Sequence, residues 1–255
     1  MFITLAQMEV FALILARVAG IFVEAPVFNS RTFPTSAKTA LAIWMTMLLW
    51  FVVPVRTIPE GALFFLVFVI KEFVIGFLIG FVCQILFSSI QAGGDLIDLQ
   101  MGTSIATALD PNTGTVASMI GRFCFFIALV VFLIINGHHM ILSAVHNSFR
   151  VLPVGAQINI SSGLITQLIT LVSTLLLLAL QLAVPALILI FLSDFSFGIV
   201  SRVAPQVNVF MLGFQVKPSL GLLVILFSLP LIMSHIALIT GQMLQELLKL
   251  FVNLR

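Results

Sequence analysis

Charged side chains are scarce in this chain of 255 residues. Only 8% of the residues are Asp, Glu, Lys or Arg, about a third of the share that is usual in soluble domains, whereas 61% are apolar. This composition excludes a water-soluble monomer. The 11 basic and 9 acidic residues are spread thinly and leave a net charge of +2. There is therefore no basic stripe of the kind that binds phosphate backbones, and we expect no nucleic-acid partner.

Residues and motifs that carry chemistry are also few. Cys83 and Cys124 each lie in an apolar stretch, where a free cysteine behaves as a small hydrophobe. His138, His139 and His146 have no neighbouring cysteine and no HExxH spacing, so a metal site is not expected. No nucleophile elbow and no glycine-rich phosphate loop occurs. The sequence thus predicts a protein that is not an enzyme and that needs no metal or cofactor.

What the chain does contain is a series of long apolar segments. A helix needs about 20 mostly apolar residues to cross the hydrocarbon core of a membrane. Six segments are candidates, at Leu5–Val27, Lys38–Val55, Gly61–Gln91, Phe123–Val145, Ile158–Leu192 and Ser219–Phe251. The first lacks the basic region and the cleavage site of a signal peptide, so we expect it to be retained. The segments predict an all-α, polytopic membrane protein of long helical hairpins and kinked helices.

Two of these segments contain an internal proline. Pro185 lies in the fifth segment and Pro230 in the sixth. The missing N–H donor and the ring clash predict a kink or a break at each position. Each segment could therefore be one bent helix or a helical hairpin.

The first apolar segment carries three charges on one side. Glu9, Arg17 and Glu24 fall within about one quadrant of a helix, with Ala16 and Gly20 between them. An unpaired charge in hydrocarbon costs at least a few kcal/mol. We therefore expect this face to meet other protein, with Arg17 paired to Glu24 or to a carboxylate on a neighbour. An ion pair between helices or subunits is favoured over a role in transport.

The third segment contains a second group of charges. Lys71 and Glu72 are adjacent, so on a helix they point about 100° apart and do not pair well with each other. Each is expected to find a partner elsewhere. Gly76 and Gly80 follow at a spacing that lets helix backbones approach closely, which predicts close packing.

The connector between the third and fourth segments is polar but is not typical of a disordered loop. From Gln91 to Gly114 it alternates small, hydroxyl and apolar side chains. Irregular backbone at membrane depth is tolerated only where protein buries it or where it lines an aqueous cavity. A pore-lining or gating element is one interpretation, with Gly93, Gly94 and Gly114 as hinges. An ordinary extramembrane loop is the other, and composition alone favours it.

Three stretches match a known family. The first runs from Arg17 to Phe28, the second leads from Gly102 to Pro111, and the third runs from Ala204 to Lys217. Within them the motif residues are Pro26, Pro205, Asn208, Phe210, Gly213 and Lys217. On these residues the chain resembles, over nearly its whole length, the FliR/T-type family of type III secretion export-apparatus proteins. A proline usually stands two residues after the glycine in that family. This chain has Gln215 there and Pro218 further on, so we expect a differently built turn.

The resemblance implies partner subunits and a location in the cell. A single copy would assemble with FliP-like and FliQ-like subunits, and with the FlhB-like switch protein, into an export gate for unfolded proteins. The gate would lie in the bacterial inner membrane, in the flagellar basal body. Residues 1–160 would be the FliP-like part, with a connector at about 91–122, and residues 161–255 the FliQ-like hairpin part.

The resemblance also implies which residues plug the closed pore. They would be Gly102, Thr103, Ser104, Ile105, Ala106, Thr107, Ala108, Leu109, Asp110, Pro111 and Asn112. Small and hydroxyl side chains suit a plug, because it must fill a channel without binding there permanently. Asp110 and Pro111 favour a turn within it.

Two other functions remain open from the residues alone. One is a self-contained secondary transporter, in which Glu24, Lys71, Glu72 or Asp95 would bind the coupling ion. An inverted repeat would favour that function, and none is visible. The other is a structural membrane scaffold whose connector is only a loop.

Overall fold

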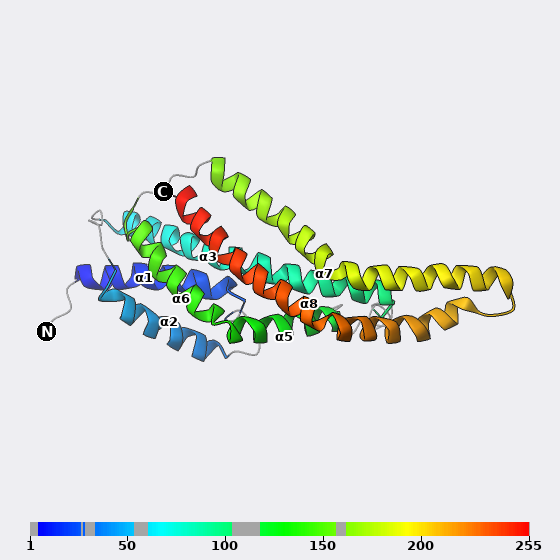
Figure 1. Cartoon of the computed structure of the whole chain (residues 1–255). Helices are drawn as coiled ribbons and strands as arrows, with labels where there is room; N and C mark the ends of the chain where they lie inside the picture. Colours follow the sequence, from blue (N-terminus) through cyan, green and yellow to red (C-terminus); the bar gives the residue numbers. More distant parts are fainter. Residues whose placement is uncertain are drawn as a thin grey trace. The chain divides into compact units, whose positions relative to one another are not determined.

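Long helices make up the structure, a computed structural model that describes residues 5–26, 28, 34–53, 61–103, 118–156 and 162–254 (Figure 1). The helices are α1 (Leu5–Glu24), α2 (Thr35–Trp50), α3 (Ala62–Met101), α5 (Met119–Ile134), α6 (Gly137–Val151), α7 (Ser162–Val203) and α8 (Val209–Asn253). Four of them, α1, α3, α7 and α8, are long and apolar enough to cross a membrane. The prediction of an all-α, polytopic membrane protein is confirmed.

The remaining apolar segments differ from single crossings. The fourth predicted segment is the pair α5 and α6, which is bent by 71° and would count as a fifth span if the pair crosses as one. The bend occurs at Asn136, whose φ of 58° lies in the left-handed region that asparagine tolerates better than most residues. The second segment is helical as α2, but its 16 residues are fewer than one crossing needs.

Helix α3 extends ten residues beyond the predicted end at Gln91. The expectation that Gly93 and Gly94 are hinges is wrong, because both lie inside α3 at close helix contacts. A Cβ atom on Gly93 would lie 2.9 Å from the Ala179 carbonyl oxygen, and one on Gly94 would lie 2.7 Å from Cα of Gly121. The glycines therefore allow α7 and α5 to approach α3. Gly114 lies outside the described residues.

Helices α7 and α8 form one hairpin, not two separate hairpins (Figure 1). Helix α7 continues through Pro185, and α8 continues through Pro218 and Pro230, so a break at these prolines is not observed. A proline removes one helical hydrogen bond, and the packing of a long helix against its neighbours offsets that loss. The reversal of the chain lies between them, at residues 204–208.

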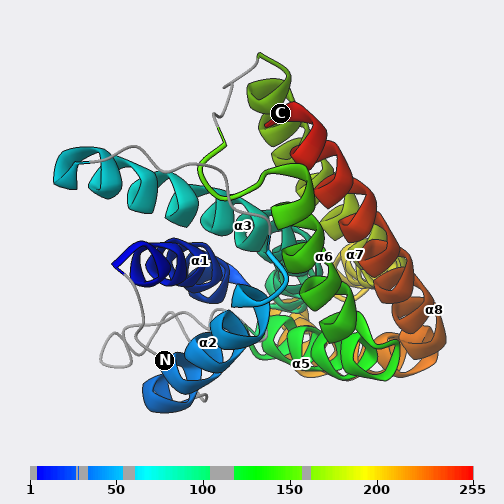
Figure 2. The same ribbon diagram turned by 90° about the vertical axis from the view of Figure 1, so that its left-hand side faces the viewer.

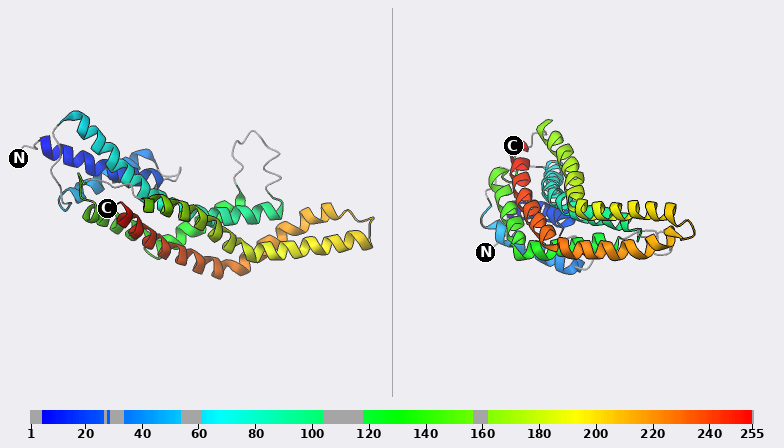
Figure 3. Two further views of the ribbon diagram at one scale, coloured as in Figure 1. Left: turned by 90° about the horizontal axis from the view of Figure 1, so that it is seen from above. Right: turned by 45° about the vertical axis from the view of Figure 1, so that its right-hand side comes forward.

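The chain divides into two compact units. The first comprises residues 1–86, 133–171 and 240–255, and the second comprises residues 87–132 and 172–239. In the first unit, α1 packs against α2 and the first part of α3 (Figure 2). In the second, the end of α3 and α5 pack with the α7–α8 hairpin, which Figure 3 shows from two further sides. The division at residue 160 by likeness to other subunits stays a prediction.

Candidate functional site

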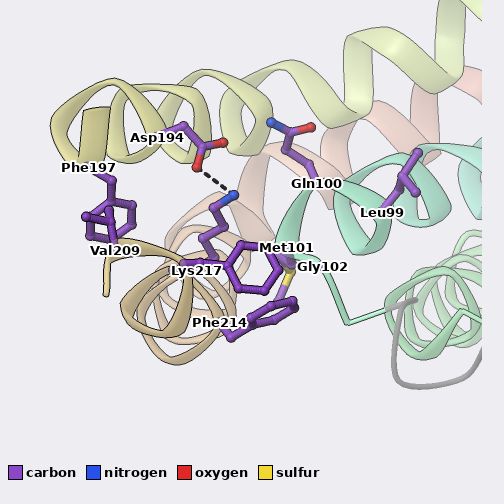
Figure 4. Close-up of a pocket in the computed structure, with 11 residues that line it drawn as sticks. Leu99, Gln100, Met101, Gly102, Asp194, Phe197, Val209, Phe214 and Lys217 are labelled. Carbon is purple, nitrogen blue, oxygen red and sulfur yellow. Dashed lines mark ion pairs between the residues drawn. The ribbon is translucent and has the colours of Figure 1, made fainter. Parts of the chain in front are cut away.

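A cavity of about 480 Å³ in the second unit is lined by the last turn of α3 and by the two arms of the α7–α8 hairpin near its turn (Figure 4). Its lining residues are Leu99, Gln100, Met101, Gly102, Asp194, Phe197, Val209, Phe210, Gly213, Phe214 and Lys217. The structure thereby brings together two stretches that the sequence analysis selected separately. These are the start of the connector at Gly102 and the motif from Ala204 to Lys217.

The motif residues Pro205 and Asn208 form the turn between α7 and α8. Pro205 lies in a turn that the Val207 N–H closes by donating to the Ala204 carbonyl oxygen at 3.0 Å. Asn208 then begins α8, because its Oδ1 accepts a hydrogen bond from the Met211 N–H at 3.2 Å. This is the bond that an N-cap residue makes to an otherwise unpaired helix donor. Pro205 and Asn208 are therefore residues that reverse the chain.

The turn expected near Gln215 and Pro218 is absent. Both residues lie within α8, which begins at Val209, ten residues before the predicted start at Ser219. The aromatic rings of Phe210 and Phe214 meet edge to face at 4.8 Å. Pro218 lies inside this helix, where it removes one backbone donor.

An ion pair forms one wall of the cavity. Nζ of Lys217 lies 2.5 Å from Oδ1 of Asp194, joining α8 to α7 (Figure 4). Phe214, one turn before Lys217 on α8, lies next to Gly102, where a Cβ atom would be 3.7 Å from the phenyl ring. The cavity is thus apolar at its base and polar at the ion pair. Sequence reasoning missed Asp194, although a carboxylate in an apolar stretch is the signal that had pointed to Glu72.

The connector starts at a defined position. Helix α3 ends at Met101, and Gly102 has a φ of +78°, which glycine adopts without strain. Thr103 then bonds back to Asp98. Of the predicted plug residues, Gly102 and Thr103 are described. Ser104 to Asn112 lie outside the described residues.

A second polar cluster is fully buried in the first unit. Arg17 on α1 donates from Nε to Oε2 of Glu72 on α3 at 2.7 Å, and both side chains are 0% exposed. Nη1 of Arg17 donates to the Leu152 carbonyl oxygen at 3.0 Å and to the Ser148 hydroxyl at 3.3 Å. The guanidinium also lies 4.1 Å from the ring centre of Phe149. The cluster therefore joins α1, α3 and α6.

The partners of the predicted charges are now visible. Of the two possibilities for Arg17, the structure has the carboxylate on a neighbouring helix. Within the described residues, neither Glu9 nor Glu24 forms an ion pair. Lys71 and Glu72 contact different groups, since Nζ of Lys71 donates to the Ala156 carbonyl oxygen at 2.5 Å. No pattern in the sequence pointed to the other partners of Arg17, which are Ser148 and Phe149 on α6 and the carbonyl of Leu152 directly after it.

Small residues bring α1 and α3 into backbone contact beside this cluster. A Cβ atom on Gly76 would lie within 2.8 Å of the Arg17 carbonyl carbon. A Cβ atom on Gly80 would lie 2.8 Å from the Ile21 carbonyl oxygen, and one on Gly20 would lie 2.8 Å from the Phe77 nitrogen. The Gly76–Gly80 spacing therefore marks a close helix crossing.

The family model described as bacterial export proteins, family 1, matches residues 8–243. The chain belongs to this family. The FliR-family chain is 30% identical to flagellar biosynthetic protein FliR of Escherichia coli, over 86% of this chain and 83% of the relative. It is 28% identical to FliR of Bacillus subtilis, over 87% and 86% of the two chains. It is 32% identical to the surface presentation of antigens protein SpaR of Shigella flexneri, over 64% and 61%.

These relationships confirm the resemblance found in the sequence. This FliR-family chain is a component of the type III export apparatus of flagellar biosynthesis, and it works in an assembly with other export proteins. Its long apolar helices make it a membrane protein of that apparatus.

Pro26, the first motif residue, is buried two residues after α1 ends at Glu24.

The residues considered for ion-coupled transport are mostly engaged with protein groups. Glu72 pairs with Arg17, Lys71 with a backbone carbonyl, and Asp95 with the Ser118 hydroxyl. In the part of the chain that the structure describes, no three His, Cys, Asp or Glu side chains gather as a metal site would require. His138 and His139 lie next to each other, with ring centres 4.3 Å apart. No observation favours a self-contained transporter.

The N-cap of α8 leads to a prediction. Replacing Asn208 with alanine leaves the Met211 N–H without its partner, and we expect a loss of about 1 kcal/mol in stability. The midpoint of thermal unfolding of the purified complex measures this change. Asn208→Ser, which retains an acceptor oxygen, should stay near the natural midpoint. Equal midpoints for the serine and alanine variants would contradict the capping role.

Proposed function

We propose that this chain is a non-enzymatic core subunit of the flagellar protein export gate. It forms, with FliP-like and FliQ-like subunits, the channel for unfolded export substrates in the bacterial inner membrane, next to an FlhB-like switch protein in the basal body. Residues 102–112 plug the closed pore. The named partners come from the family resemblance.

The observation that carries this proposal is apolar surface of greater length than a membrane can cover. Helices α3, α7 and α8 have 40, 42 and 45 residues. At 1.5 Å per residue each has a contour of roughly 60–68 Å, about twice the ~30 Å hydrocarbon core. Large apolar side chains are exposed at both ends of these helices, including Leu63 and Leu99 on α3 and Phe210 and Val252 on α8.

Lipid alone therefore covers only about half of this surface, and exposed apolar patches of this extent mark protein interfaces. Sister subunits with matching apolar faces are the natural cover. The charged groups support a role in assembly over one in chemistry. The buried Arg17–Glu72 pair joins helices, and Asp194 and Lys217 neutralise each other in the cavity.

The position of the connector supports its role as a plug. It leaves α3 at Gly102, beside the cavity and not on an isolated surface turn. Its sequence from Thr103 to Ala108 contains only hydroxyl-bearing, alanine and isoleucine side chains. Such residues fill a channel without forming ion pairs that would hold it shut.

Deleting Ser104–Asn112 tests the plug. We expect the assembled complex to make the membrane permeable to ions and small molecules, because the deletion removes material from the pore and leaves the helices intact. Dye or ion flux through vesicles that contain the complex measures this leak. A same-length replacement of the segment with glycine and serine serves as the matched control, and it should leak less than the deletion.

The result depends on showing that the complex is still assembled. Purification in mild detergent should recover two smaller apolar partners, in unequal copy number, with both the natural chain and the deletion variant. Unchanged permeability in such a complex would reject the plug. Failure to recover the partners with the natural chain would reject the gate assignment itself.

A further inference from the structure

We propose that Asp95 and Asp98 are positioning residues that hold the two ends of the connector against α3. Asp98 fixes the start through Thr103, and Asp95 fixes the end through Ser118. The inference deepens the proposed function, on which it rests, because it states how a plug in this chain would be kept in place. All four residues belong to the described part of the second unit.

The first anchor is short and buried. The Thr103 hydroxyl oxygen lies 2.5 Å from Oδ1 of Asp98, to which it donates, and 3.1 Å from the Asp98 carbonyl oxygen. The Asp98 residue is 2% exposed. The left-handed conformation of Gly102 turns the chain back over the helix end, and this turn brings the hydroxyl within reach. A buried carboxylate requires such a donor, because burying it without a hydrogen bond costs several kcal/mol.

The second anchor uses a hydroxyl that makes two bonds. The Ser118 hydroxyl and the Asp95 carboxylate both lie beside Gly121, where the hydroxyl interacts with the carboxylate. The Ser118 oxygen also accepts a hydrogen bond from the Gly121 N–H at 2.8 Å, which caps the start of α5. The close crossing of α3 and α5 makes this possible. Gly121 leaves room for the Asp95 carboxylate, which a Cβ atom at that position would overlap.

Both carboxylates occupy positions where a helix does not favour them. Asp95 and Asp98 lie one turn apart on the same face of α3, so their like charges repel. Asp98 also lies in the last turn of α3, which ends at Met101, where the helix dipole disfavours an anion. Within the described residues neither forms an ion pair with a cation. The partners that the structure gives them are the two hydroxyls at the ends of the connector.

The consequence is that the two described ends of the connector are held close together on α3. Residues 103 and 118 are attached to positions three residues apart on one helix, which are separated by roughly 4.5 Å along its axis. A loop whose ends are held together can change its own conformation without moving the helices that carry it. The anchors thereby hold Thr103 and Ser118, the two described ends of the connector, to neighbouring turns of α3.

Paired substitutions that differ only in the hydroxyl test this inference. Thr103→Val combined with Ser118→Ala removes both donors, while Thr103→Ser combined with Ser118→Thr keeps them. Hydrogen–deuterium exchange of the assembled complex reports on the backbone from Asp98 to Gly121. We expect roughly tenfold faster exchange at both ends of the connector in the valine/alanine variant, because each lost bond involves a charged acceptor. The serine/threonine variant should match the natural chain.

Vesicle permeability is the second measurement. The exchange rates test the anchors, whereas the permeability tests the plug. Faster exchange together with a leak in the valine/alanine variant alone supports the anchors as positioning devices for a plug. Equal exchange in the two variants overturns the anchors, whatever the permeability. Faster exchange without a leak supports the anchors. If vesicles with the Ser104–Asn112 deletion variant are also impermeable, the plug hypothesis is rejected. A loss of exchange protection throughout α3 would overturn the proposal in favour of a purely structural role for the hydroxyls.

Discussion

Replacing Glu72 with alanine is expected to cost about 3–5 kcal/mol of stability, which is enough to prevent the chain from accumulating. The substitution leaves the Arg17 guanidinium buried without its counter-charge, in a site where it is 0% exposed. The hydrogen bonds to Ser148 and Leu152 remain, but they do not neutralise the charge. The yield and the thermal unfolding midpoint of the detergent-solubilised complex measure the effect.

Two further variants separate charge burial from a general loss of contacts. Replacing Arg17 and Glu72 together with leucine removes both charges, and stability should recover well above that of Glu72→Ala. Lys249→Met breaks the Lys249–Glu246 pair, whose lysine is 62% exposed, and should cost less than about 1 kcal/mol. If Glu72→Ala is as mild as Lys249→Met, Arg17 is not buried in the assembled protein.

Replacing Gly76 with alanine is expected to cost about 3 kcal/mol or more, which is the upper range for overpacking. The added methyl group would overlap the backbone of α1 at Arg17, and backbone cannot move aside as the end of a side chain can. Helix α1 would have to shift, and the Arg17–Glu72 geometry would change with it. The same unfolding measurement detects the loss.

The chain offers matched controls for this glycine. Gly198 in α7 and Gly241 in α8 also lie inside helices, but an added Cβ meets nothing within 4 Å at either position. Gly198→Ala and Gly241→Ala should be neutral or slightly stabilising, since alanine favours a helix more than glycine does. If all three alanine variants behave alike, the close crossing of α1 and α3 is not present.

Much of the helical framework could be predicted from the sequence, because runs of apolar residues depend only on composition and length. The helix ends were less predictable. Helix α3 continues past Gln91 because Gly93, Gly94 and Asp95 find close contacts on α5 and α7, and a linear pattern does not contain those neighbours. Helix α8 starts before the predicted position because Asn208 caps it by accepting a hydrogen bond from the Met211 N–H.

The candidate site was predicted in parts. Gly102 was selected as part of the plug, and Phe210, Gly213 and Lys217 as part of the family motif. Their meeting in one cavity follows from the hairpin that reverses at Pro205 and Asn208. The roles of Asp98, Thr103 and Ser118 could not be predicted, because hydroxyl and carboxylate side chains in a polar connector look the same whether or not they bond. The connector was predicted to start at Gln91, but α3 continues to Met101, so the attachment points of the connector depend on tertiary contacts.

The apolar length of α3, α7 and α8 has a consequence for the cell that makes this protein. A newly inserted copy without its neighbours would present roughly half of each helix to water or to headgroups. Such a copy would aggregate or be degraded by membrane proteases. If sister subunits cover these helices, as proposed, their synthesis sets the amount of this chain in the cell, and excess expression of its gene alone is expected to yield little additional protein.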